Sequence, residues 1–579
     1  MPVLIFPGND PWLDFQSNEL IPTPTLGFIM FNCPNKRAGV CLFSASPDTK
    51  KEGETMANEM DGRTAGRIGN LNPSISRSGF VKTMGVGMAA AATGLSMAAK
   101  AQTPGGGGTT TVNATGKYPI DVKKVQDAVD RYNTVFLSGT FNFGNDSTGR
   151  GCVTIAKEGV TLQADTNGAT ILGGGVWRDI PPNSMIYSIG PAISVEAPGV
   201  TIRGLTMSGS MDTGIFVTPS SRSAQPSDKV ITIENNTLAA NWCALVTSST
   251  GGWPVVIRKN KLTGTVGLFA DWVGCAYQNS QFVQRLSPFD IVENDITSTR
   301  EYPREEEVDD GILVTGWYTP AEFLPPYVTP PAPDWGDNGP VTITGNTVTM
   351  AHSDAPFEDW SEGINIGRST SGLNHCIVAN NIVKGYGQSG ISKWPYGHDN
   401  QIIGNDLSGF VPWEEQIMVS ARNTTVMNNV FGLANEVPFF TCGISLFSAN
   451  MHPPYTPIPL PVENCMLMGN DYRRTGLPGG DWYTCIWIGS NVDYGGEGNE
   501  VKNNLIKETG KFPSGTGPSQ QTFTMNFSSP PLCHDNRIIG LSADNISDPG
   551  IGQRIKDARS RMVQYYAQWG ERMLNRKRA

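Results

Sequence analysis

The feature that most constrains this chain is a step of the form Asn-x-apolar that recurs beyond residue 230. Each step follows alternating apolar positions, as in Val230–Ile233, and a second apolar run such as Gly311–Val314 comes after a variable loop. This period-two pattern predicts two or three short strands per repeat. The steps begin at Asn236, Asn260, Asn294, Asn346, Asn380, Asn405, Asn428, Asn470 and Asn503. Their spacings predict a coil of about 23–25 residues that carries insertions of variable length.

A chain that winds into such coils can place one Asn of each coil at the same bend. The amides then stack and bond from coil to coil, which satisfies polar groups at an inward-facing turn. We therefore assign the Asn residues a structural role. Charged residues make up only 17% of the chain, whereas Gly (66) and Pro (41) are plentiful, as expected for short strands joined by turns. The sequence predicts an all-β solenoid.

The repeat resembles the pectin-lyase-like family of parallel β-helix proteins. The resemblance covers residues 118–548, from a predicted N-terminal capping helix at Val122–Val129 to a last coil near Asn536–Ile539. It implies a right-handed parallel β-helix. It also implies a secreted or surface protein, most often an enzyme that cuts or modifies polysaccharides, with adhesins and phage tailspikes as minorities.

The N-terminal hundred residues have the layout of an export signal. Residues 76–101 contain a basic start, a Gly/Ala/Met-rich apolar run and an Ala-x-Ala end, which indicates a signal peptide. Its start, Ser76–Lys82, resembles a twin-arginine signal in which Ser78 replaces the second arginine, so both the Tat and the Sec route stay open. We expect a secreted or periplasmic protein. The apolar run is short for a membrane span, so no stable membrane insertion is expected after cleavage.

The remaining segments complete the predicted organisation. Residues 1–75 are interpreted as an unstructured or misassigned extension, with translation beginning at Met56 or Met60. Residues 102–117 form a Gly/Thr-rich linker, and residues 549–579 form a C-terminal capping helix with helical apolar spacing. The formal charge of −10 argues against a nucleic-acid partner, since that function needs a basic face.

Candidate catalytic residues emerge when the coils are aligned on their Gly-Ile strands. Asp310 in Asp-Gly-Ile then lies beside Glu362 in Glu-Gly-Ile, and Asp309 lies one step earlier. Glu414 and Glu415 fall near the same edge two coils beyond Glu362. Two carboxyl groups about 5–9 Å apart are what glycoside cleavage requires, one protonated and one ionised. We expect Asp310 and Glu362 to act as acid and base or nucleophile, with Asp309 assisting.

A local resemblance supports this expectation. The segment Val308–Leu313 resembles a strand of polygalacturonase-type hydrolases, and Ser361–Ser369 resembles the next one, although Glu362 stands where that pattern has His. An acidic cleft repels polyanions, which favours a neutral or weakly charged substrate.

The alternative enzyme is a polysaccharide lyase that acts by β-elimination on a uronic-acid polymer. Lys393 is then the best candidate for the base, and Arg368, Arg300 and Arg304 are nearby alternatives. Asp309, Asp310 and Glu362 would hold Ca²⁺. We therefore predict that a hydrolase would need no cofactor, whereas a lyase would need Ca²⁺. The metal site is otherwise unknown. A further alternative is a non-catalytic carbohydrate-binding surface protein.

Aromatic and basic residues near the acidic coils are candidates for binding a poly- or oligosaccharide, because sugar rings stack on aromatic faces. These candidates are Trp317, Tyr318, Trp335, Trp360, Arg368 and Trp394. The five histidines are too few and too scattered to suggest a catalytic triad or a zinc site, and His352 and His398, which flank the acidic coils, are interpreted as structural. The favoured function is an exported carbohydrate-active enzyme that hydrolyses glycosidic bonds.

Overall fold

The computed structural model describes the chain from residue 107 to residue 539, with gaps. The gaps are residues 145–149, 176–189, 210, 220–224, 279–280, 300–309, 317–337, 352–360, 368–372, 394–396, 434–439, 451–458, 461, 463, 475–481, 491–497, 509–519 and 526–531. The predicted extension (1–75), signal peptide (76–101) and C-terminal helix (549–579) lie outside the described residues. No helix within the described part is long and apolar enough to cross a membrane.

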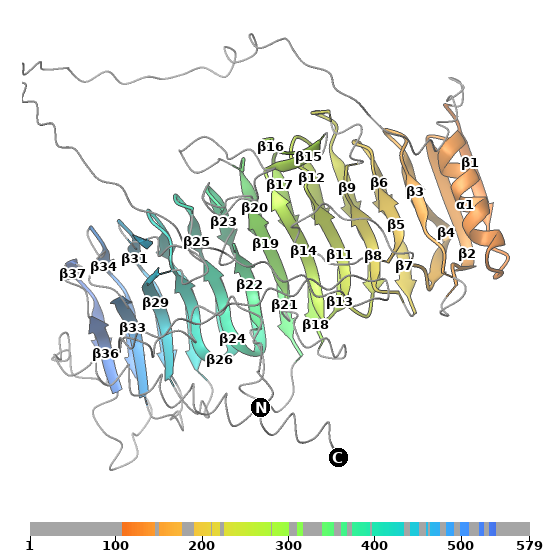
Figure 1. Cartoon of the computed structure of the whole chain (residues 1–579). Coiled ribbons are helices and arrows are strands. Elements are labelled where there is room, and N and C mark those ends of the chain that lie inside the picture. The colour runs from red at the N-terminus through yellow and green to blue at the C-terminus, as the bar shows by residue number, and fades with distance from the viewer. Residues whose placement is uncertain are drawn as a thin grey trace, which may run out of the picture. The chain divides into compact units, whose positions relative to one another are not determined.

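The described residues form a right-handed parallel β-helix, as predicted, in which each coil contributes one strand to each of three parallel sheets (Figure 1). The first sheet contains β5 (Pro191–Val195), β8 (Thr213–Val217), β11 (Cys243–Ser248), β14 (Val266–Val273), β19 (Ile312–Gly316), β22 (Glu362–Ile366), the second halves of β24 (Ile382–Lys393) and β26 (Asp406–Val419), β29 (Phe440–Asn450), β33 (Trp482–Ser490) and β36 (Gln520–Met525).

The second and third sheets follow in the same order along the chain. The second contains β6 (Thr201–Arg203), β9 (Ile231–Glu234), β12 (Val255–Arg258), β17 (Phe289–Val292), β20 (Val341–Thr344), β23 (Cys376–Ala379), β25 (Gln401–Ile403), β27 (Thr425–Met427), β31 (Met466–Met468), β34 (Glu500–Lys502) and β37 (Leu532–His534). The third contains β7 (Leu205–Ser208), β10 (Thr237–Ala239), β13 (Lys261–Gly264), β18 (Asp295–Ser298), β21 (Thr347–Met350), the first halves of β24 and β26, β28 (Val430–Leu433), β32 (Asp471–Arg474), β35 (Leu505–Glu508) and β38 (Arg537–Ile539).

One helix, α1 (Ile120–Arg131), packs at the N-terminal end of the solenoid and confirms the predicted capping helix (Figure 1). It buries Val125, Ala128 and Val129. The first coils are built from β1 (Thr109–Asn113), β2 (Thr134–Asn142), β3 (Val153–Ile155) and β4 (Thr161–Leu172). Antiparallel pairs are formed by β15 (Cys275–Gln278) with β16 (Gln281–Gln284), and by β30 (Pro459–Leu460) with β29.

The boundary between linker and β-helix differs from the prediction. Residues 109–113 belong to β1, which pairs in parallel with β2, so the segment 102–117 is not a linker throughout. The physical reason is composition, because Thr109, Thr110 and Thr111 are β-branched and favour a strand even though four glycines precede them.

A ladder of stacked asparagines at the turn between the second and third sheets confirms the structural role predicted for them. From Asn260 onward, each side-chain oxygen accepts the backbone N–H and the amide N–H of the Asn one coil earlier, whereas that of Asn236 accepts the Leu205 N–H. Each amide also donates to a backbone carbonyl. Its members are Asn236, Asn260, Asn294, Asn346, Asn381, Asn405, Asn429, Asn470, Asn504 and Asn536.

Three positions of the predicted ladder were wrong by one residue. Asn380, Asn428 and Asn503 are not in the ladder, because each takes the left-handed backbone conformation just before it, with φ of 55°, 57° and 55°. Asn tolerates that conformation better than most residues. The apolar residues show the same shift, since Ile382 is exposed while Val383 is buried.

Candidate active site

The strands of the first sheet align as the Gly-Ile comparison predicted. Ile312 pairs with both Leu268 and Ile364, and Ile364 pairs with Ile391. Gly311 and Gly363 are required at the edge where the sheet begins, because a Cβ at either position would meet a core valine at 2.2 or 2.4 Å. The absence of a side chain at these glycines lets the chain enter the sheet beside the packed core.

Asp310 and Glu362 lie on adjacent coils at this edge, as predicted. The Gly311 N–H donates to the Glu362 carbonyl (2.9 Å), and the Glu362 N–H donates to Oδ1 of Asp310 (3.0 Å). The Asn365 amide donates to Oδ2 of Asp310 (3.1 Å). Both acids are buried, with 0% of Asp310 and 2% of Glu362 exposed. The Asp310 carboxylate is therefore fixed by two donors from the following coil.

The acidic row continues along the edge, again in the predicted register. Glu362 pairs with Ser389, and Ser389 pairs with Glu415, whose Oε2 accepts the Ser389 hydroxyl (3.2 Å). Glu415 is also buried, with 1% exposed. Three carboxyl groups thus lie within four consecutive coils. Burial and mutual repulsion both disfavour ionising all of them at once.

A row of residues on the outer side of the first sheet adjoins Asp310. Ile364 and Ile366 belong to the core, so Asn365 between them points outward, and Ser392 pairs with Asn365 on the next coil. Both are buried, and Oδ1 of Asn365 and Oγ of Ser392 have no hydrogen-bond partner among the described residues. A buried oxygen without a partner is costly, which makes these two atoms candidates for contact with a ligand.

The sequence analysis missed Asn365 and Ser392. The sequence pattern could have identified them, because each lies one residue after the isoleucine used to align the coils. Side chains alternate along a strand, so the residue after a core isoleucine points to the outer side of the sheet. Asp309 and the six predicted sugar-binding residues (Trp317, Tyr318, Trp335, Trp360, Arg368 and Trp394) lie outside the described residues, and their roles stay predictions.

Lys393 does not lie where a catalytic base is needed. It is the last residue of β24, and its register partners Ile366 and Val419 belong to the core. Its side chain is fully buried and lies near Cys376, another core residue. A base for β-elimination must reach a proton on the sugar ring, whereas this amine lies inside the solenoid. This position argues against the catalytic role predicted for Lys393, which stays a prediction.

The burial of Lys393 has a consequence for stability. Loss of hydration lowers the pKa of the Lys393 amine from 10.5 to about 7, against a smaller opposing effect of Cys376. The unfolded chain therefore binds more protons than the folded one between about pH 7 and pH 10.5, so stability rises with pH through this window. We expect the free energy of unfolding to rise by about 2 kcal/mol between pH 7 and pH 9.

Replacing Lys393 with Met should remove this rise and stabilise the protein at pH 7. The measurement is the urea midpoint of unfolding at pH 7, 8 and 9. Lys384→Met is the matched control, because Lys384 lies in the same strand but is exposed, and this variant should keep the wild-type pH slope. An equal slope in wild type and Lys393→Met would show that Lys393 is not the residue responsible.

Comparisons with known proteins find similarity to solved structures alone. No family model matches the chain, and no curated protein sequence matches it. Three solved structures illustrate the structural similarity. An alginate lyase shares 11% identity (TM-score 0.45, 76% of this chain and 88% of the other). An A-module of a mannuronan C-5 epimerase from Azotobacter vinelandii shares 14% (0.43, 71% and 95%). A surface protein and adhesin of Streptococcus pneumoniae shares 13% (0.32, 74% and 100%).

Proposed function

We propose that the protein is an exported carbohydrate-active enzyme that cleaves glycosidic bonds of a poly- or oligosaccharide by hydrolysis. The observation that carries the proposal is the pair Asp310 and Glu362, held on adjacent coils with the Asp310 carboxylate fixed by two donors. Adjacent coils are about 4.8 Å apart, which is close to the carboxylate separation used in glycoside cleavage.

The proposed reaction needs one protonated and one ionised carboxyl group. A buried pair of carboxyl groups holds one proton in preference to two negative charges. The protonated group donates to the leaving oxygen, while the ionised group activates water or attacks the anomeric carbon. The oxygens of Asn365 and Ser392 would accept or share hydrogen bonds with sugar hydroxyl groups beside the pair. Both acids are buried, so the proposal requires that substrate gains access to them.

The second candidate is a calcium-assisted lyase, and one observation favours it. The Asp310 carboxylate, Oδ1 of Asn365 and Oγ of Ser392 are all oxygen donors of the kind that Ca²⁺ prefers. With Lys393 buried in the core, this mechanism requires another base. A carbohydrate-binding protein without activity is the third candidate, and it has no use for a buried acid pair.

The experiment is a screen of the purified chain from Gln102 onward on neutral and uronic polysaccharides, with and without EDTA. Reducing ends and absorbance near 235 nm are read together, because hydrolysis gives only the first and elimination gives both. We expect reducing ends on a neutral or weakly charged polymer, without the absorbance and insensitive to EDTA. Absorbance that EDTA removes would replace the hydrolase by the calcium-assisted lyase. No product on any polymer would overturn both.

A further inference from the structure

Two histidines and an aspartate meet at the turn that leads into the second sheet. His375 precedes β23, and His398 and Asp399 precede β25, the neighbouring strand. His375 and Asp399 are 24 residues apart, which is one coil without an insertion, so they occupy equal places on consecutive coils. His398 was predicted to be structural because the histidines are far apart along the chain. Comparing their separations with the length of one coil would have shown that they lie close together.

The backbone conformation holds these three residues close together. His375 and Asp399 both take the left-handed conformation, with φ of 53° and 56°, and the His375 N–H donates to the His398 carbonyl (3.2 Å). The His398 N–H donates to the side-chain oxygen of Asn374 (3.0 Å). Gly397 turns the chain just before, and any Cβ there would lie 2.2 Å from the Leu373 carbonyl oxygen. The three side chains are thus brought to one side of the turn by a preorganised backbone.

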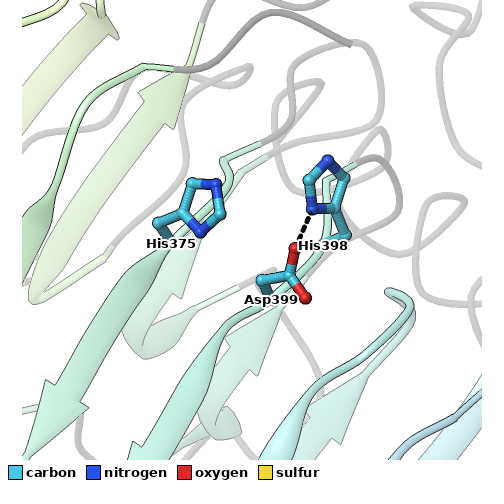
Figure 2. A group of neighbouring side chains, drawn as sticks. All are labelled: His375, His398 and Asp399. Carbon is cyan, nitrogen blue, oxygen red and sulfur yellow. Dashed lines mark hydrogen bonds and ion pairs between the residues drawn. The ribbon is translucent and has the colours of Figure 1, made fainter. Parts of the chain in front are cut away.

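The side chains form a compact group with nitrogen and oxygen donors (Figure 2). The His375 and His398 rings meet edge to face with centroids 5.6 Å apart, and Nδ1 of His398 lies 2.5 Å from Oδ2 of Asp399. One potential ligand atom from each residue lies within 4.8 Å of the other two. His398 is half-buried, whereas His375 and Asp399 are exposed. A solute can therefore reach the group directly.

The Asp399 side chain is held in place by contacts at both of its oxygens. The Asn423 amide, from the next coil, donates to Oδ1 of Asp399 (3.2 Å). The second oxygen is left beside the two imidazoles. A carboxylate held in this way is a ready ligand for a cation.

We propose that His375, His398 and Asp399 bind a divalent transition metal of the zinc class. Two imidazoles and one carboxylate are a donor set that suits Zn²⁺ and its first-row neighbours, whereas Ca²⁺ and Mg²⁺ prefer oxygen alone. Ligand bonds of about 2.0–2.2 Å require donor atoms a little over 3 Å apart. Rotation of the exposed His375 ring closes the remaining separation. Three protein ligands leave one position open to water.

This site is separate from the acid pair, and its metal would join two consecutive coils. A metal that binds only the folded chain raises the melting temperature, by an amount that grows with the logarithm of the free metal concentration over Kd. The purified protein is first treated with EDTA to remove bound metal, and the EDTA is then removed. Co²⁺ binding is followed by visible absorption, Zn²⁺ binding by calorimetry, and the melting temperature is measured with and without Zn²⁺. None of these readouts depends on enzymatic activity.

His375→Asn and Asp399→Asn are the test variants, because Asn tolerates the left-handed conformation at both positions. His534→Ala, in β37 of the same sheet, is the control that removes a histidine elsewhere. We expect wild type and the control to bind one equivalent of metal and to melt at a higher temperature with Zn²⁺. Each test variant should bind at least tenfold more weakly and lose that shift. Equal affinity in wild type and both test variants, or no binding by wild type, would overturn the proposal.

Discussion

Replacing Asp310 with Asn should lower polysaccharide cleavage about 10²–10⁴-fold, the range that a positioned acid or base contributes. The variant keeps the size of the side chain and an oxygen that accepts the Glu362 N–H. The new amide group would face the Asn365 amide, which can turn so that its unpartnered Oδ1 becomes the acceptor. We therefore expect loss of activity with little change in folding.

The control for Asp310→Asn is Asp290→Asn in β17, which makes the same chemical change in the second sheet. Reducing ends are measured on the polymer that the screen identifies, and folding is followed by circular dichroism and melting temperature. Full activity of Asp310→Asn at an unchanged melting temperature would show that the acid row is a structural link between coils.

The largest loss of stability is expected for Asn381→Ala. The Asn381 side chain accepts the backbone N–H and the amide of Asn346, and it donates to the Ile343 carbonyl and to Asn405. All of these groups are buried, and each donor left without a partner costs about 1–3 kcal/mol. We expect a loss of about 3 kcal/mol or more in the free energy of unfolding.

The adjacent Asn380 provides a matched control, because the sequence pattern cannot distinguish the two residues. Asn380 is exposed and has φ of 55°, so Asn380→Gly should change stability by less than about 0.5 kcal/mol. The measurement is the urea midpoint of the wild type and both variants. Equal losses in the two variants would contradict the ladder assignment.

The coil repeat was predictable because stacking places the same demand on every coil. An Asn recurs at one bend of successive coils, and a glycine before an isoleucine recurs in several of them. Aligning these residues predicted the register that brings Asp310 beside Glu362. The choice between Asn380 and Asn381 was not predictable from the pattern. Two asparagines followed by two apolar residues satisfy both registers, and only the left-handed turn decides between them.

Other features depend on geometry that sequence patterns do not carry. A lysine is normally kept in water by the cost of burying its charge, so Lys393 was taken for a reachable base until its core neighbours were known. The His375, His398 and Asp399 group depends on two left-handed residues and on Gly397, none of which marks a metal site by itself. Asn365 and Ser392 were hidden because alternation was used to find the core and not the outer side of the strand.

In the proposed mechanism, one of Asp310 and Glu362 acts as the acid and the other as the base or nucleophile. The most direct test is the pH dependence of kcat/KM for wild type and Glu362→Gln on the polymer that the screen identifies. A working pair predicts a bell-shaped wild-type profile with two limbs, and the variant should lose one limb as well as most of its rate. A variant that keeps both limbs and most of the wild-type rate would contradict the account.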